Sequence, residues 1–163
     1  MEIKKLSISF EEYSSPDELK AADRELLEQS MKACEMAYAP YSSFRVGAAV
    51  RLLNGQVVTG NNQENASYPL GLCAERVALF YSQAHFSGTA VDAIAIYAFA
   101  AEFSLKQPVT PCGACRQVIA EYEQRYNNKI RIIMGNGHGM VQIVNGAESL
   151  LPLAFYMEEL KKH

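Results

Sequence analysis

Two short motifs, CAER at residues 73–76 and PCGACRQ at residues 111–117, constrain the fold of this chain more than any other feature. Three thiols, those of Cys73, Cys112 and Cys115, can bind a tetrahedral zinc ion and leave its fourth position open for water. Such a site requires the two motifs to meet in space. The rest of the chain must therefore form a frame that brings residue 73 beside residues 112–115.

Each motif is predicted to open a helix. The residues that would share a buried face are Cys73, Val77, Phe80 and Ala84 in the first helix, and Cys115, Ile119, Tyr122 and Tyr126 in the second. Two helix N-termini would then direct their positive dipole ends at the thiolates. Three thiolates around Zn²⁺ leave a net negative charge, and Arg76 is a further counter-charge.

Glu75 is the candidate catalytic residue. It lies two residues after a ligand, close enough to carry protons without binding the metal. Zinc can lower the pKa of bound water to about 7. Zinc deaminases of nucleobases share this order of residues, with a glutamate as proton carrier and then Pro-Cys-x-x-Cys.

Cys34 leaves two interpretations open. It shares a helical face with Leu27, Met31 and Tyr38, which favours a small residue of the hydrophobic core. The alternative is a fourth ligand in a structural zinc site. That alternative does not explain why a glutamate follows Cys73 so closely, but a lone C-x-x-C also suits redox and structural sites.

Strands that alternate with helices predict one layered α/β domain over residues 1–163. The predicted strands are 3–10, 44–53, 56–60, 91–100, 130–134 and 140–144. Asn54-Gly55 is typical of a two-residue hairpin turn. A short C-terminal helix is expected after residue 152.

A further helix is predicted from Pro16 to about Tyr38. Ser15 would be its N-cap and Glu18 would complete a capping box. The role of residues 1–20 is left unassigned.

Charge and hydropathy exclude several partners. The net charge of −3 and the pI of 5.6 argue against nucleic acid and against an anionic membrane surface. No apolar run approaches the roughly 18 residues that span a bilayer. Residues 1–13 lack the apolar core of a secretory signal, which favours the cytoplasm.

The chain resembles the small, homotetrameric cytidine deaminases over about residues 30 to 160. The matching segments are 38–44 (YAPYSSF), 46–49 (VGAA), 62–68 (NQENASY), 73–76, 111–117 and 150–152 (LLP) with Phe155. The resemblance implies a three-layer α/β/α fold with a mixed sheet of about five strands. It also implies one Zn²⁺ per subunit, held by Cys73, Cys112 and Cys115.

The reaction that the resemblance implies is hydrolytic deamination of cytidine and 2′-deoxycytidine, as in pyrimidine salvage. Water activated by the metal attacks carbon 4 of the base, and Glu75 carries protons to the ring nitrogen and to the leaving ammonia. The alternatives are the same chemistry on a cytosine-bearing antibiotic such as blasticidin S, and a zinc-stabilised module without activity. An enzyme that edits RNA or DNA is disfavoured by the negative charge.

Five further residues receive roles in substrate binding from the resemblance. The backbone amide of Ala74 would contact the base carbonyl, and Phe44 would line the base pocket. Asn62 and Glu64 would bind the ribose hydroxyls. Phe155 would reach the active site of a neighbouring subunit. For each phenylalanine, an ordinary place in the core is the alternative.

Four positions depart from the pattern of the family: Asn61, Gln63, Pro69 and Leu153. The first three lie beside the expected sugar contacts. They leave the chemistry intact, and they leave the choice among related nucleosides open.

Overall fold

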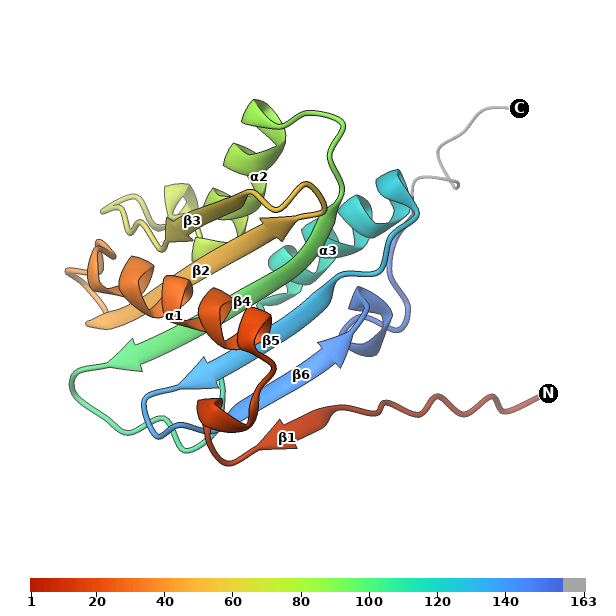
Figure 1. Ribbon diagram of the computed structural model, residues 1–163, viewed down its shortest axis with the longest axis horizontal. Helices are drawn as coiled ribbons and strands as arrows, with labels where there is room; N and C mark the ends of the chain where they lie inside the picture. Colours follow the sequence, from red (N-terminus) through yellow and green to blue (C-terminus); the bar gives the residue numbers. More distant parts are fainter. Residues whose placement is uncertain (157–163) are drawn as a thin grey trace.

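A computed structural model describes residues 1–156, and six strands within them form one mixed sheet (Figure 1). The strands are β1 (Glu11–Tyr13), β2 (Phe44–Leu52), β3 (Val57–Asn61), β4 (Val91–Ala100), β5 (Arg131–Asn136) and β6 (Val141–Asn145). Their order across the sheet is β1-β6-β5-β4-β2-β3. The β4–β5 pair is parallel, and the other neighbouring pairs are antiparallel. The mixed sheet is confirmed, with one strand more than expected.

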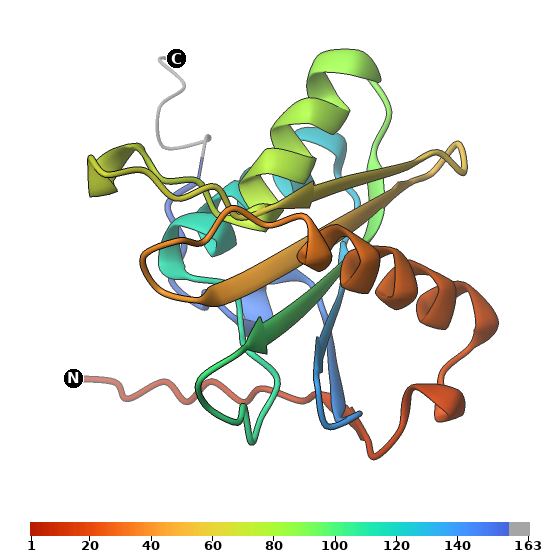
Figure 2. The same cartoon turned by 90° about the vertical axis from the view of Figure 1, so that its left-hand side faces the viewer.

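Three α-helices of the described chain cover the two faces of the sheet (Figure 2). They are α1 (Ala21–Glu35), α2 (Ala74–His85) and α3 (Gly113–Tyr126). Short 3-10 turns are η1 (Pro16–Glu18), η2 (Tyr68–Leu70) and η3 (Ala147–Ser149). Helix α1 packs on one face, whereas α2 and α3 pack on the other, so the three-layer α/β/α arrangement is confirmed.

Strand β4 lies in the interior of the sheet because its sequence is apolar on both faces. Ile94 and Ile96 contribute to the core beneath α2 and α3, and Ala93 and Ala95 to the core beneath α1. A strand buried on both faces is expected to be apolar throughout. The predicted bounds of this strand are confirmed.

The N-terminal region differs from the prediction. Ser15 and Glu18 form the expected capping box, but it opens the short turn η1 rather than α1. Helix α1 ends at Glu35 rather than Tyr38. The strand expected at residues 3–10 is absent from the described chain, and β1 follows at Glu11–Tyr13, where β6 supplies a hydrogen-bonding partner.

The buried faces of α1 and α2 were predicted only in part. In α1, Leu27 and Cys34 are buried but Met31 is exposed. In α2, Phe80 and Ala84 are exposed, because the helix turns its Ala74, Ala78 and Leu79 side toward the sheet. The predicted face of α3 is confirmed by buried Cys115, Ile119 and Tyr122, with Tyr126 partly buried.

The β2–β3 connection is longer than the predicted two-residue turn. The N–H of Leu52 bonds to the carbonyl of Gln56, and Gly55 alone in this turn has a positive φ, of 84°. Type I′ turns need a positive φ at both central residues, so this connection belongs to another class. Residues 153–156 are irregular, and the rest of the predicted C-terminal helix lies outside the described residues.

Gly60 permits close packing of β3 against α2. A Cβ at this position would lie 2.6 Å from the backbone nitrogen of Ala78 and 2.8 Å from the carbonyl oxygen of Ala74. Both contacts are shorter than van der Waals separation, and backbone atoms cannot rotate away. Gly60 therefore fixes the distance between the sheet and the first turn of α2.

We predict that Gly60→Ala destabilises the fold by about 2 kcal/mol, the middle of the range for overpacked positions. Gly113→Ala is the matched control, since a Cβ there would meet nothing within 4 Å. Urea unfolding followed by circular dichroism measures both changes. Equal stability of the two variants would contradict the role of Gly60.

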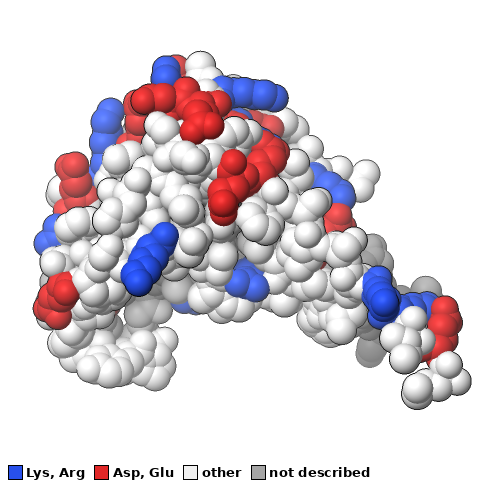
Figure 3. Space-filling model, turned by 90° about the horizontal axis from the view of Figure 1, so that it is seen from below, with Lys and Arg blue, Asp and Glu red and all other residues white. Residues whose placement is uncertain are grey.

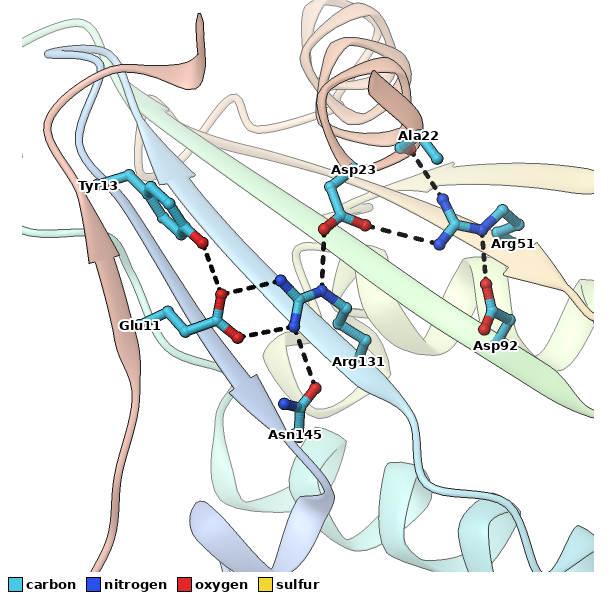
Figure 4. Close-up of polar contacts among 8 residues, drawn as sticks. All are labelled: Glu11, Tyr13, Ala22, Asp23, Arg51, Asp92, Arg131 and Asn145. Carbon is cyan, nitrogen blue, oxygen red and sulfur yellow. Dashed lines mark hydrogen bonds and ion pairs between the residues drawn. The ribbon is translucent and has the colours of Figure 1, made fainter. Parts of the chain in front are cut away.

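A chain of ion pairs crosses the α1 face of the sheet (Figure 4). Asp23 of α1 accepts a hydrogen bond of 2.9 Å from Arg131 and lies 3.6 Å from Arg51. Arg131 also donates to Glu11 of β1, at 2.9 and 3.1 Å, and these bonds lower the pKa of Glu11 to about 2. The chain of ion pairs ends at Asp92, which accepts from Arg51 at 2.6 Å.

We predict that Asp23→Asn destabilises the fold by about 3 kcal/mol, because loss of one buried charge leaves its partners incompletely compensated. The side chain of Asp23 is only 6% exposed. Asp17→Asn is the control: its carboxylate is 88% exposed and 3.9 Å from Arg24, so less than about 0.5 kcal/mol is expected. Urea denaturation at neutral pH would reveal the difference, and similar effects of both variants would argue against a structural role for Asp23.

Candidate active site

The three predicted thiols meet at one point in the structure. The Sγ atoms of Cys73 and Cys112 are 3.7 Å apart, and those of Cys112 and Cys115 are 3.5 Å apart. All three lie within 4.8 Å of one another. A tetrahedral zinc with Zn–S bonds of about 2.3 Å requires S···S separations near about 3.8 Å. The donor set and its spacing therefore fit a zinc ion.

Two helix starts present these thiols. Cys73 is the N-cap of α2 and Cys112 is the N-cap of α3. Neither side chain makes a capping hydrogen bond, so both thiols are available to a metal. The first-turn N–H groups of both helices add positive potential at the sulfur atoms.

Arg76 supplies a full positive charge beside the thiols. Its Nη2 lies 3.6 Å from the Sγ of Cys73, and its buried Nε has no hydrogen-bond partner among the described residues. A partly buried guanidinium next to three sulfur atoms favours their anionic forms. A hydrogen bond from the Cys115 thiol and the contact with Arg76 lower the pKa of Cys73 to about 5, against the effect of burial.

Cys34 does not belong to this cluster. It lies on α1, on the other face of the sheet, and its side chain is buried. Burial raises the pKa of its thiol to about 11. The interpretation of Cys34 as a core residue is confirmed, and the structural site with four cysteines is wrong for the described residues.

Glu75 is buried beside the thiols and lines a cavity of about 540 Å³. Burial is the main cause that raises the pKa of its carboxyl group. Other residues around the cavity include Phe44, Val46, Asn62, Gln63, Glu64, Tyr68, Ala74, Ile96 and Val109. Four of the five predicted binding residues therefore surround the same space as Glu75 and Cys73.

The amide of Asn62 makes two hydrogen bonds with the β2 backbone. Its Oδ1 accepts from the N–H of Val46 at 2.8 Å, and its Nδ2 donates to the carbonyl of Phe44 at 2.9 Å. An asparagine side chain has two N–H groups and two lone pairs, so one donor and one acceptor position are still available. Asn62 can thus hold the start of β2 and contact a ligand at the same time.

Glu64 joins the loop that follows β3 to the segment before β2. Its carboxylate accepts from the N–H groups of Tyr41 and Ser42, at 2.8 and 3.3 Å, and from the Ser42 hydroxyl. The hydroxyl of Ser42, with these backbone donors, keeps the pKa of Glu64 below its usual value. The anionic form is therefore favoured at the rim of the cavity.

Known proteins share the sequence region that forms this site. A family model described as "Cytidine and deoxycytidylate deaminase zinc-binding region" matches residues 20–128, which include the three cysteines and Glu75. The chain belongs to the cytidine and deoxycytidylate deaminase family. Residues 1–19 precede the matched region.

Individual relatives in this deaminase family cover most of the chain. A cytidine deaminase of Halalkalibacterium halodurans is 45% identical over 139 residues, 85% of this chain and 98% of that protein. One from Sporosarcina psychrophila is 40% identical over 83% of this chain and 92% of that protein. The crystal structure of a Burkholderia pseudomallei cytidine deaminase has a TM-score of 0.71 at 40% identity, covering 84% of this chain and 100% of that chain.

Two residues of the second motif have a positioning function that the sequence did not reveal. Arg116 donates to the carbonyls of Pro111 and Leu150, both at 2.7 Å. Gln117 exchanges hydrogen bonds with the backbone of Phe155, at 2.6 and 3.4 Å. They connect α3 of the deaminase site to the C-terminal segment, and their place directly after Cys115 was the available signal.

Phe155 is exposed and does not line the cavity of its own chain. Phe44 does line it and stacks on Phe103 with a centroid distance of 6.4 Å. Of the departures from the family pattern, Asn61 is directed away from the cavity, since its Nδ2 bonds to the carbonyl of Ala33 in α1. No helix among residues 1–156 is long and apolar enough to cross a membrane.

We predict that Cys112→Ala loses bound zinc, because two thiols cannot replace three in a tetrahedral site. Cys34→Ala keeps one zinc per chain, since its thiol lies on the other face of the sheet. Atomic absorption after dialysis measures the metal content of both. Full zinc in the Cys112 variant would remove that residue from the ligand set.

Proposed function

We propose that this chain catalyses zinc-dependent hydrolytic deamination of cytidine and 2′-deoxycytidine, which yields uridine or 2′-deoxyuridine and ammonia. The observation that carries the proposal is the buried Glu75 beside three thiols at a cavity of nucleoside size. Curated relatives that cover most of their own length bear the name cytidine deaminase. Pyrimidine salvage is a role that fits this reaction.

Glu75 is the proton carrier in this mechanism. The zinc ion, when bound, supplies activated water at neutral pH. The Glu75 carboxylate takes one proton of the attacking water and delivers it to N3 of the ring. It then takes the second proton from the new hydroxyl at carbon 4 and passes it to the amino group, which leaves as ammonia. Its burial keeps bulk water from competing for these protons. Glu75 is the one acidic residue of α2, so we assign the proton transfer to this group.

The walls of the cavity orient the nucleoside. The N–H of Ala74 is among the first-turn donors of α2, which have no partner within the helix, and it is assigned to the base carbonyl. Phe44 is assigned to the face of the base. Asn62 and Glu64 are assigned to the ribose hydroxyls, so the site selects a nucleoside over a free base. Arg76 compensates the charge of the thiolates.

We assign a homotetramer to the enzyme, with sites shared between subunits. Phe155 supports this assignment, because it is exposed although Gln117 fixes its backbone. An aromatic ring held in this way is suited to a neighbouring active site. The cytoplasm is the proposed location, and neither nucleic acid nor a membrane is a proposed partner.

The first test is the change in ultraviolet absorbance when the zinc-loaded protein meets cytidine, deoxycytidine, cytosine or blasticidin S. Conversion of the two nucleosides, but not of cytosine, is expected because cytosine has no ribose or deoxyribose hydroxyls for Asn62 and Glu64 to bind. Activity on blasticidin S alone would overturn the substrate. Bound zinc without any conversion would support a module without activity.

We predict that Glu75→Gln lowers kcat for cytidine by about 10²–10⁴-fold, the usual contribution of a general acid and base. The amide has nearly the same shape, so zinc content is unchanged. Glu25→Gln, on exposed α1 surface, is the control. Normal turnover in the Glu75 variant would refute its role in proton transfer.

We predict that Glu64→Gln raises the KM for cytidine about tenfold, since an anionic acceptor for ribose hydroxyls is lost. The amide oxygen can still accept from the N–H groups of Tyr41 and Ser42, so the change removes the negative charge and keeps these backbone contacts. Steady-state kinetics with cytidine and deoxycytidine measure the change. An unchanged KM for both would exclude Glu64 from sugar binding.

A further inference from the structure

Residues 3–13, here called the N-terminal arm, lie outside the region that the family model matches. The arm runs away from the body of the molecule as an extended segment whose last three residues form β1 (Figure 1). Four apolar side chains of the arm are each more than half exposed: Ile3, Leu6, Ile8 and Phe10. Three of them, Leu6, Ile8 and Phe10, alternate along the extended chain, which is typical of a strand that lacks its partner.

The arm is attached firmly at one end only. Glu11 and Tyr13 pair with Ile143 and Val141 of β6, and Glu11 is ion-paired with Arg131. Continued toward the N-terminus, this register reaches the last residue of β6 after two further positions. No backbone hydrogen bond joins residues 1–10 to the described chain, and the outer edge of β1 is free of other strands there.

The sequence of the arm is complementary to itself in one antiparallel register. When two copies of the arm pair about a two-fold axis at Ile8, residues of matching character face each other. The facing pairs are Lys4 with Glu12, Lys5 with Glu11, Leu6 with Phe10, Ser7 with Ser9, and Ile8 with Ile8. Opposite charges and apolar side chains on facing positions stabilise antiparallel strands.

Neighbouring two-fold registers lose this match. An axis at Ser7 places Lys4 opposite Phe10, and an axis at Ser9 places Leu6 opposite Glu12. Moving the axis by one residue shifts the pairing by two positions, so each side chain keeps its face and the match of facing residues alone distinguishes these registers. The sequence thus specifies one register.

We propose that the N-terminal arm pairs with the arm of a second copy of this chain and joins two sheets edge to edge through β1. The contact is isologous, as in most symmetric dimers. Leu6, Ile8 and Phe10 of both copies then share one face, beside a cavity of about 650 Å³ between the arm and the body. Figure 3 shows the arm projecting from the body with side chains of both charges near its end.

Disulfide formation tests the register. Facing residues of antiparallel strands have Cα atoms about 4.5–5.5 Å apart, within the range for a disulfide. Ile8→Cys is therefore expected to give a covalent dimer under mild oxidation of the full-length, zinc-loaded protein. Leu6→Cys is the matched control, since Leu6 faces Phe10 rather than its own copy. The unmodified chain corrects for its four native cysteines.

Charge reversal tests the pairing in the Ile8→Cys background. Glu12→Lys places Lys4 opposite a second lysine and is expected to slow cross-linking about tenfold, because facing like charges destabilise strand pairs. Adding Lys4→Glu restores opposite charges and the rate. Glu2→Lys is the control, because its facing residue in this register, Ser14, is uncharged.

Cytidine deamination is measured for every variant, and unchanged activity is expected because the arm lies far from the thiols in the fold (Figure 1). No dimer from Ile8→Cys, or equal dimer from Leu6→Cys, would overturn the proposal. So would a rate that Glu12→Lys leaves unchanged or that the double reversal does not restore. Cross-linking is scored on a non-reducing gel, so its outcome is independent of whether the chain is a deaminase.

Discussion

The meeting of two helix N-termini behind the sheet is the constraint on which the site depends. Helices α2 and α3 must begin at the same place for Cys73, Cys112 and Cys115 to lie within 4.8 Å of one another. Gly60 lets α2 approach β3, and Arg116 connects the start of α3 to the residues before it. Small, rigid contacts of this kind set metal geometry, since a displacement of about 1 Å is enough to disrupt a site.

Electrostatics then decides what this arrangement can hold. Three thiolates would repel one another in a site of low dielectric constant, but two helix dipoles and the Arg76 guanidinium oppose that repulsion. A divalent cation completes the balance. The same surroundings bury Glu75 without an ion pair of its own among the described residues, and burial raises the pKa of its carboxyl group. Metal binding and proton transfer thus depend on one set of charges.

The sequence predicted best what local chemistry determines. The thiol cluster follows from ligand spacing, and β4 follows from its continuous apolar composition. Predictions failed where tertiary contacts decide. The arm has the alternation of a strand, but residues 3–10 find no partner within the described chain. The buried face of α2 is set by Gly60 and the sheet rather than by its own pattern. The backbone contacts of Asn62 and Gln117 depend on segments distant in sequence, which no local pattern encodes.

Chemistry and assembly occupy separate parts of this fold. The cavity lies where β2, β4 and the starts of α2 and α3 come together, whereas β1 is the strand at one edge of the sheet. Strands β5 and β6 separate that edge from β4, and the Glu11–Arg131 ion pair fixes it to the core on the α1 face. A substitution at the outer side of β1 is therefore not expected to alter the positions of the three thiols. Such an edge can acquire a new contact with another copy while the catalytic residues stay in place.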